Sequence, residues 1–161
     1  LLVNEQTAGE RILLAGTVYD GNGAPVPDAM VEIWQADAGG HFNHPADPQR
    51  TEADPHFRGF GRANTTDSGR YQFRTVKPGV VAGNVTPYIN VRIFARGMLI
   101  HAVTRIYFAD EASKNDDPTL QAIAAARRDT LLAKRADFGD LPCYRFDIRL
   151  QGKDETVFFD L

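Results

Sequence analysis

Near its N-terminus the chain reads ILLAGTVYDGNGAPVPDAMVEIWQ over residues 12–35. The first eight of these residues are apolar or β-branched, which is typical of a buried strand, and residues 29–35 alternate well enough to predict a second strand. Between the two, residues 20–23 (Asp-Gly-Asn-Gly) supply turn chemistry, because glycine adopts positive φ without steric cost. We therefore predict that the chain opens with two strands joined as a hairpin.

The remainder of the chain repeats this pattern of short strands between turns. Alternation of apolar and polar side chains predicts further strands with one face towards water, at residues 70–76, 88–94, 103–108 and 144–150. Residues 156–159 are predicted to form the last strand. Residues 36–62 are rich in Gly and Pro and have no period, so they predict a long loop, and long ordered loops are often functional.

One helix is predicted, from Pro118 to about Lys134. Asp117 stands where an N-cap belongs, Pro118 suits the first turn, and the alanines that follow favour a helix. Short strands with a single late helix indicate an all-β fold: an antiparallel β-sandwich or barrel-like core with long loops and one helix in the C-terminal half. We expect residues 1–161 to form a single domain.

The composition argues against several classes of protein. The net charge is −3 and the basic residues are scattered, whereas a nucleic-acid-binding surface has a basic stripe or patch. With one cysteine, Cys143, the chain forms no internal disulfide and no cysteine zinc site, and we interpret this residue as a small buried hydrophobe. The apolar stretches are strand-sized, so no membrane span is predicted. We expect a cytoplasmic protein.

Residue patterns alone indicate no reaction centre. His41, His44, Asp47 and His56 all lie in the predicted loop, where no regular element would hold them as metal ligands. Solvated loop histidines are therefore the simpler interpretation. The sequence contains no Gly-x-Ser-x-Gly nucleophile motif and no phosphate-binding loop. Composition and spacing by themselves give a β-sandwich without an assigned function.

Longer motifs point to a family. Residues 14–42 carry a signature of glycine, acidic and apolar spacings: LAGTV at 14–18, GAPV at 23–26 and VEIWQADAGGHF at 31–42. TDSGRY at 66–71 and TVKPG at 75–79 continue it. On these residues the chain resembles the intradiol ring-cleavage dioxygenases over residues 9–161. Its Phe-Ala-Arg-Gly run at 94–97 and its ending resemble in particular the α chains of two-chain enzymes in this family.

The resemblance implies that this chain has lost a metal site. Catalytic members of the family hold non-haem Fe(III) with two tyrosines and two histidines, donors that suit a ferric ion. By the family's motifs, the tyrosine positions correspond here to Phe42 and Val81, and the histidine positions to Tyr88 and Asn90. All four ligand positions are then degenerate, so the resemblance implies no bound metal and no catalytic residue in this chain.

The resemblance also implies partners and a substrate. In two-chain members a homologous β chain binds the Fe(III), αβ pairs build a larger assembly, and the α chain lines the mouth of the β site, where protocatechuate meets O₂. By this resemblance Arg96 is predicted to reach that shared site and to attract the substrate carboxylate. Family α chains carry an N-terminal arm at the same site. Residues 6–10 match its motif only in part, so we expect the arm to be absent here.

Two alternatives remain open at this point. A non-enzymatic β-sandwich module that binds a protein or a carbohydrate would share the architecture, because fold does not fix function. A self-sufficient iron dioxygenase with other ligands is the second alternative. The Phe-Ala-Arg-Gly run and the family-like ending favour the enzyme subunit, since a generic binding module would not need them.

Overall fold

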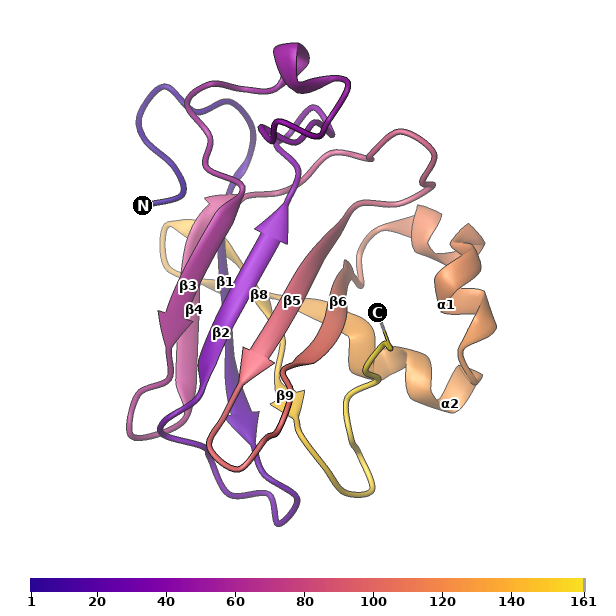
Figure 1. The fold of residues 1–161 in the computed structure, drawn as a ribbon. Coiled ribbons are helices and arrows are strands. Elements are labelled where there is room, and N and C mark those ends of the chain that lie inside the picture. Colours follow the sequence, from indigo (N-terminus) through magenta and orange to yellow (C-terminus); the bar gives the residue numbers. More distant parts are fainter. Residues whose placement is uncertain (161) are drawn as a thin grey trace.

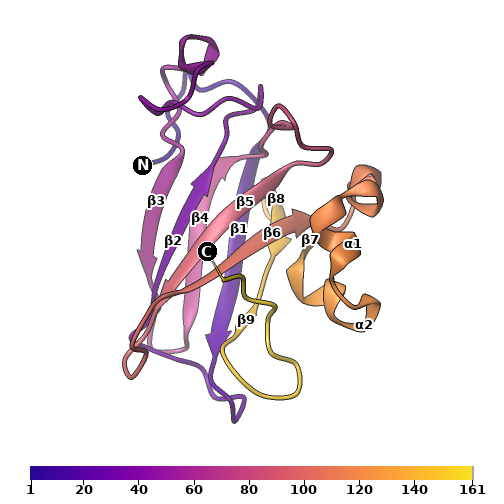
Figure 2. The same ribbon diagram turned by 45° about the vertical axis from the view of Figure 1, so that its right-hand side comes forward.

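The computed structural model describes residues 1–160, apart from the side chains at 137 and 138. One curled, mixed sheet of nine strands makes up the molecule, in the order β3-β2-β5-β6-β7-β8-β1-β4, with β9 paired to β1. The strands are β1 (Arg11–Tyr19), β2 (Met30–Gln35), β3 (Phe60–Asn64), β4 (Arg70–Val76), β5 (Tyr88–Phe94), β6 (Ala102–Phe108), β7 (Leu132–Phe138), β8 (Leu141–Arg145) and β9 (Ile148–Arg149). Figures 1 and 2 show that the sheet curls into two layers, with β3, β2, β5 and β6 in front of β4, β1 and β8.

Alternate residues of the strands fill the space between the two layers. On β1, the side chains of Ile12, Leu14 and Val18 are fully buried, and on β5 the same holds for Ile89 and Ile93. These side chains belong to one continuous apolar core with residues of β2, β4, β6 and β8. Removing this much aliphatic surface from water is the main force that holds the two layers together.

The mostly-β fold is confirmed, and the predicted strands at 70–76 and 88–94 coincide with β4 and β5. The predicted antiparallel arrangement is confirmed only in part, because β8 and β9 run parallel to β1, and β7 runs parallel to β6. The strand predicted at 144–150 is split into β8 and β9. It breaks because the Asp147 carboxylate, rather than a backbone carbonyl, accepts the N–H of Thr17 on β1, at 3.0 Å.

The predicted opening hairpin is also wrong. The turn itself forms: Asp20 Oδ1 accepts the N–H groups of Asn22 and Ala24, each at 2.9 Å, and Gly23 has φ +79°. However, the chain then crosses to the other layer, so β1 pairs with β4 while β2 pairs with β3 and β5. The predicted loop at 36–62 ends early, at β3, and contains the short 3-10 helix η1 (Arg50–Glu52). Residues 156–159 form no strand.

The single long helix predicted from Pro118 is wrong beyond its first turn. The segment forms α1 (Pro118–Ala122), α2 (Ala125–Arg128) and the 3-10 turn η3 (Asp129–Leu131), and β7 follows; the 3-10 helix η2 (Ala112–Asp116) precedes α1. The N-cap prediction is confirmed, since Asp117 Oδ1 accepts the N–H of Leu120 at 3.0 Å. The break lies at Ile123 and Ala124, where the backbone is extended with ψ of 139° and 131°.

Tertiary packing explains why the alanine-rich segment does not continue as one helix. Leu120 and Leu131 pack with Tyr88 and Tyr107 in a second apolar cluster on the outer side of the front layer. Placing both leucines on this cluster requires the chain to turn back, and this packing outweighs helix propensity. The helices therefore cover only the β6 side of the front layer, whereas the outer face of β3, β2 and β5 has no helix over it (Figure 2). Within residues 1–160, no helix is long and apolar enough to cross a membrane.

Candidate functional site

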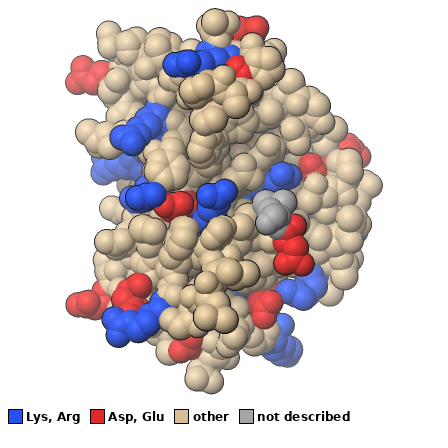
Figure 3. All heavy atoms as spheres, in the orientation of Figure 1, with Lys and Arg blue, Asp and Glu red and all other residues tan. Residues whose placement is uncertain are grey.

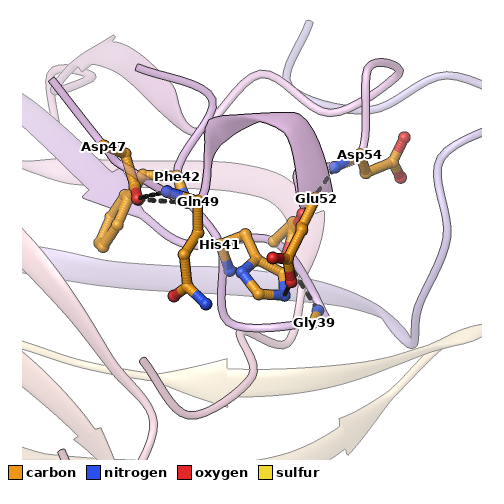
Figure 4. Close-up of polar contacts among 8 residues, drawn as sticks. Gly39, His41, Phe42, Asp47, Gln49, Glu52 and Asp54 are labelled. Carbon is orange, nitrogen blue, oxygen red and sulfur yellow. Dashed lines mark hydrogen bonds and ion pairs between the residues drawn. The ribbon is translucent and has the colours of Figure 1, made fainter. Parts of the chain in front are cut away.

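The loop after β2 is organised around the buried side chain of Asp37. Its Oδ1 atom accepts the N–H groups of Gly39 at 2.9 Å and His41 at 3.0 Å, and its Oδ2 atom accepts the N–H of Asp54 at 2.7 Å. Figure 4 labels the three donor residues, Gly39 and His41 at the start of the loop and Asp54 near its end. A carboxylate that accepts three backbone N–H groups replaces the hydrogen bonds that a strand or helix would have provided. The segment is thereby fixed although it lacks regular structure.

Glycines bring this loop against the loop that follows β4. A Cβ atom on Gly40, which has φ +86°, would lie 2.1 Å from the carbonyl oxygen of Val80. A Cβ on Gly79 would lie 2.4 Å from the carbonyl oxygen of Ala38, and the Gly79 N–H donates to the Asp37 carbonyl at 2.8 Å. Only glycine permits so close an approach of two backbones. The contact places residue 42 of one loop near residue 81 of the other.

Two further interactions position the residues around Phe42. Asp47 Oδ2 accepts the Phe42 N–H at 3.2 Å, while its Oδ1 accepts the Gln49 N–H at 2.7 Å (Figure 4). His41 Nε2 lies 3.7 Å from Glu52 Oε2, and its buried Nδ1 atom has no hydrogen-bond partner among the described residues. Across the described part of the chain, no three His, Cys, Asp or Glu side chains gather as a metal site would require.

The four positions that the resemblance assigns to iron ligands lie around Trp34 on β2. Phe42 and Val81 line one hollow of about 430 Å³ together with Trp34. Asn90 lies directly opposite Trp34 on β5, and both residues line a second hollow. Tyr88 is the first residue of β5 and belongs to the apolar cluster against which Val81 packs. The structure thus brings these four positions to one end of the front layer.

A cation lies against both of the strand positions. The Arg105 guanidinium carbon is 4.5 Å from the centroid of the Tyr88 ring, and Arg105 Nε donates to Asn90 Oδ1 at 3.2 Å. Burial raises the pKa of the neighbouring Tyr107 hydroxyl; Arg105 opposes this shift and Asp117 adds to it. Phe42 and Val81 carry no donor atom, and a fixed positive charge covers the other two positions. This donor set does not fit a ferric ion.

Arg96 lies away from these four positions. It follows the other end of β5, in the turn towards β6, and its side chain is 87% exposed. Its Nε atom lies 2.9 Å from Asp28 Oδ2, which directs the guanidinium without covering it. The tip of the same turn exposes Leu99 and Ile100. Within this chain, then, the predicted substrate-binding arginine does not join the degenerate positions, and it has free donors for another molecule.

Sequence reasoning missed several residues that shape this region. Trp34 and Asp37 belong to the family motif at residues 31–42, but the resemblance assigned no role to either of them. It also assigned no role to Arg92 or Arg105. Alternation on the two strands did contain a signal, since residues 88, 90 and 92 must share one face of β5. The cross-strand register that places Arg105 opposite Asn90 is known only from the folded sheet.

A family model described as "Dioxygenase" matches residues 1–152. The chain belongs to the intradiol dioxygenase family. Two intradiol dioxygenase relatives are protocatechuate 3,4-dioxygenase alpha chains, each 48% identical: that of Pseudomonas putida over 99% of this chain and 80% of its own, and that of Burkholderia cepacia over 95% and 78%. A protocatechuate 3,4-dioxygenase beta chain from Burkholderia cepacia is 36% identical over 95% of this chain and 69% of its own.

Solved structures of intradiol dioxygenases share the fold. The dioxygenase domain of a dioxygenase and carbohydrate-binding protein fusion from Streptomyces sp. SirexAA-E superposes with a TM-score of 0.74, at 25% identity, over 94% of this chain and 86% of that one. Catechol 1,2-dioxygenase from Acinetobacter sp. ADP1 gives a TM-score of 0.68 at 24% identity, over 92% of this chain and 55% of that one. The curled mixed sheet is therefore the fold of this family.

Proposed function

We propose that this chain is the α subunit of a protocatechuate 3,4-dioxygenase and pairs with a homologous β chain that binds the Fe(III). Together the two chains would cleave protocatechuate with O₂ to 3-carboxy-cis,cis-muconate, breaking the ring bond between the two hydroxylated carbons. The free, buried thiol of Cys143 accords with a reducing compartment, so a cytoplasmic location is part of the same proposal.

The donor set around Trp34 is the observation that carries this assignment. An iron-binding chain of the family needs four ligands, and here Phe42 and Val81 supply none, while Arg105 lies against Tyr88 and Asn90. The identities point the same way: 48% to the alpha chains against 36% to the beta chain. A chain that keeps the family fold but lacks the metal ligands can serve as a subunit of an enzyme in which a related chain binds the metal.

In this proposal the chain contributes binding and orientation rather than chemistry. The ferric ion on the β chain would supply the activation of the bound catechol towards O₂. Arg96 would extend from the β5–β6 turn into the β chain's site, where its guanidinium would meet the substrate carboxylate. A planar guanidinium forms paired, charge-assisted hydrogen bonds with a carboxylate, so it attracts the anion and also fixes the direction of the ring. The Asp28 contact would hold Arg96 in place for this role.

Metal content tests the subunit assignment. We expect the chain purified alone to contain no stoichiometric iron and to show no visible absorption band. Co-expressed with its β chain, it should form a coloured complex that contains iron and consumes O₂ on addition of protocatechuate. Stoichiometric iron in the isolated chain, or full activity of the isolated β chain, would contradict the assignment.

Substitution of Arg96 tests its role in the assembled enzyme. Arg96→Ala is expected to lower kcat/KM for protocatechuate about ten-fold, mainly through KM, because one charge-assisted contact is lost. Arg74→Ala is the matched control, since this arginine is exposed on β4 in the other layer. Catechol, which lacks the carboxylate, should be turned over equally by the enzyme with and without Arg96. An equal loss for both substrates would show that Arg96 supports assembly rather than the carboxylate.

A further inference from the structure

The hollow that Trp34 and Asn90 line on the outer face of the front layer holds no ligand in the proposed function. Its volume is about 280 Å³, and its lining includes Trp34, Phe60, Asn90, Arg92, Val103 and Arg105, with Glu32 also on its wall. Pockets for drug-sized ligands have volumes of roughly 300–1,000 Å³, so this hollow suits a ligand built on a single ring. It lies on four neighbouring strands, β3, β2, β5 and β6, and is therefore a rigid site.

Two guanidinium groups on this face have no acidic partner in the described part of the chain. Glu32 lies between Arg62 on β3 and Arg92 on β5, but its carboxylate is bound to Arg62 Nε at 2.6 Å. Among residues 1–160, no carboxylate lies within ion-pair distance of Arg92 or Arg105. In Figure 3 the same face shows basic side chains on either side of an acidic one near its middle. The two unpaired charges give the hollow a positive potential that attracts an anion.

The hollow also has an aromatic wall. Trp34 is 39% exposed, which is unusual for the largest apolar side chain. Its ring is fixed by Phe60, edge-on at a centroid distance of 6.2 Å, and by His44 at 5.2 Å. A ring held in this way offers a face for stacking without further loss of side-chain entropy on binding.

We propose that this hollow is a binding site for a small aromatic carboxylate. The carboxylate is bound by the guanidinium groups of Arg92 and Arg105, and the ring of the ligand lies against Trp34. Asn90 Oδ1 accepts a hydrogen bond from Arg105 Nε, which holds the Arg105 guanidinium on the wall of the hollow. The site is separate from Arg96, and the residues named for it all belong to this chain.

Trp34 provides a direct measurement, because it is the only tryptophan of the chain. Benzoate is the probe, since it does not absorb at the wavelength used to excite tryptophan selectively. Titration of the full chain with benzoate is expected to change the Trp34 fluorescence along a saturable, one-site curve. Acetate, which has the charge without the ring, and benzyl alcohol, which has the ring without the charge, should each bind at least about ten-fold more weakly.

Variants assign the binding to the two arginines. Arg92→Gln and Arg105→Gln should each weaken benzoate binding about ten-fold, whereas Arg74→Gln on the opposite layer should leave it unchanged. Arg92 is exposed on β5, so its variant keeps the test valid even if loss of Arg105 disturbs the fold. Linear, non-saturable quenching, equal binding of acetate, or unchanged binding by both arginine variants would each overturn the proposal.

Discussion

Replacing Asp37 with alanine is expected to lower the free energy of unfolding by about 3–5 kcal/mol, because three backbone N–H groups lose a charged acceptor at once. These donors belong to Gly39, His41 and Asp54, which lie at both ends of the loop that carries residue 42. The Asp37 side chain is only 4% exposed, so water cannot simply take its place. Urea unfolding followed by circular dichroism measures the change.

Two variants serve as controls for Asp37. Asp37→Asn retains one acceptor oxygen and should cost about half as much, since the charge and one hydrogen bond are lost. Asp47→Ala removes a similar carboxylate, which accepts two backbone N–H groups in a more exposed part of the same loop. This variant should lower the free energy of unfolding by about 1 kcal/mol. If Asp37→Ala were no more destabilising than Asp47→Ala, burial of the Asp37 carboxylate would not be what fixes the loop.

How far the sequence predicts this fold can be seen from individual strands. In β4 and β5, apolar and polar side chains alternate, because one face of each strand is more buried than the other. The predicted ranges therefore coincide with the strands of the structure. β3 reads Phe-Gly-Arg-Ala-Asn and follows a Gly- and Pro-rich loop, so it has no apolar alternation to detect. β7 begins inside an alanine-rich segment whose local propensity favours a helix, and only the packing of Leu120 and Leu131 on the sheet reveals the break.

The site was predictable in a similar, partial way. The family resemblance assigns four ligand positions, Phe42, Val81, Tyr88 and Asn90, and the structure gathers them at one end of the front layer. Sequence spacing could not predict the position of Arg105, because it is 15 residues from Asn90 and faces it only through the register of β5 with β6. Long-range charge placement depends on strand pairing, which local patterns do not encode.

Restoring the four ligand side chains is expected to be insufficient to restore iron binding. The variant with Phe42→Tyr, Val81→Tyr, Tyr88→His and Asn90→His should remain without stoichiometric iron while Arg105 is present. In the native chain the Arg105 guanidinium lies 4.5 Å from the ring at position 88 and 3.2 Å from the acceptor at position 90. Two like unit charges about 4 Å apart repel by about 4 kcal/mol at an effective dielectric of about 20, and a ferric ion carries three charges.

Adding Arg105→Gln to this four-residue variant should therefore raise the iron content towards one per chain and produce the visible absorption of ferric tyrosinate. Metal analysis and the absorption spectrum measure the two effects independently. Arg92→Gln in the same background is the matched control. It removes an equal charge from the same face of the sheet, but Arg92 does not make the contacts that Arg105 makes with positions 88 and 90. Iron binding that was already complete with Arg105 present would show that the loss of donor atoms alone inactivated this site. Binding that appears only after Arg105→Gln would show that the arginine takes the place of the metal's charge, which explains how the scaffold keeps its shape without the ion.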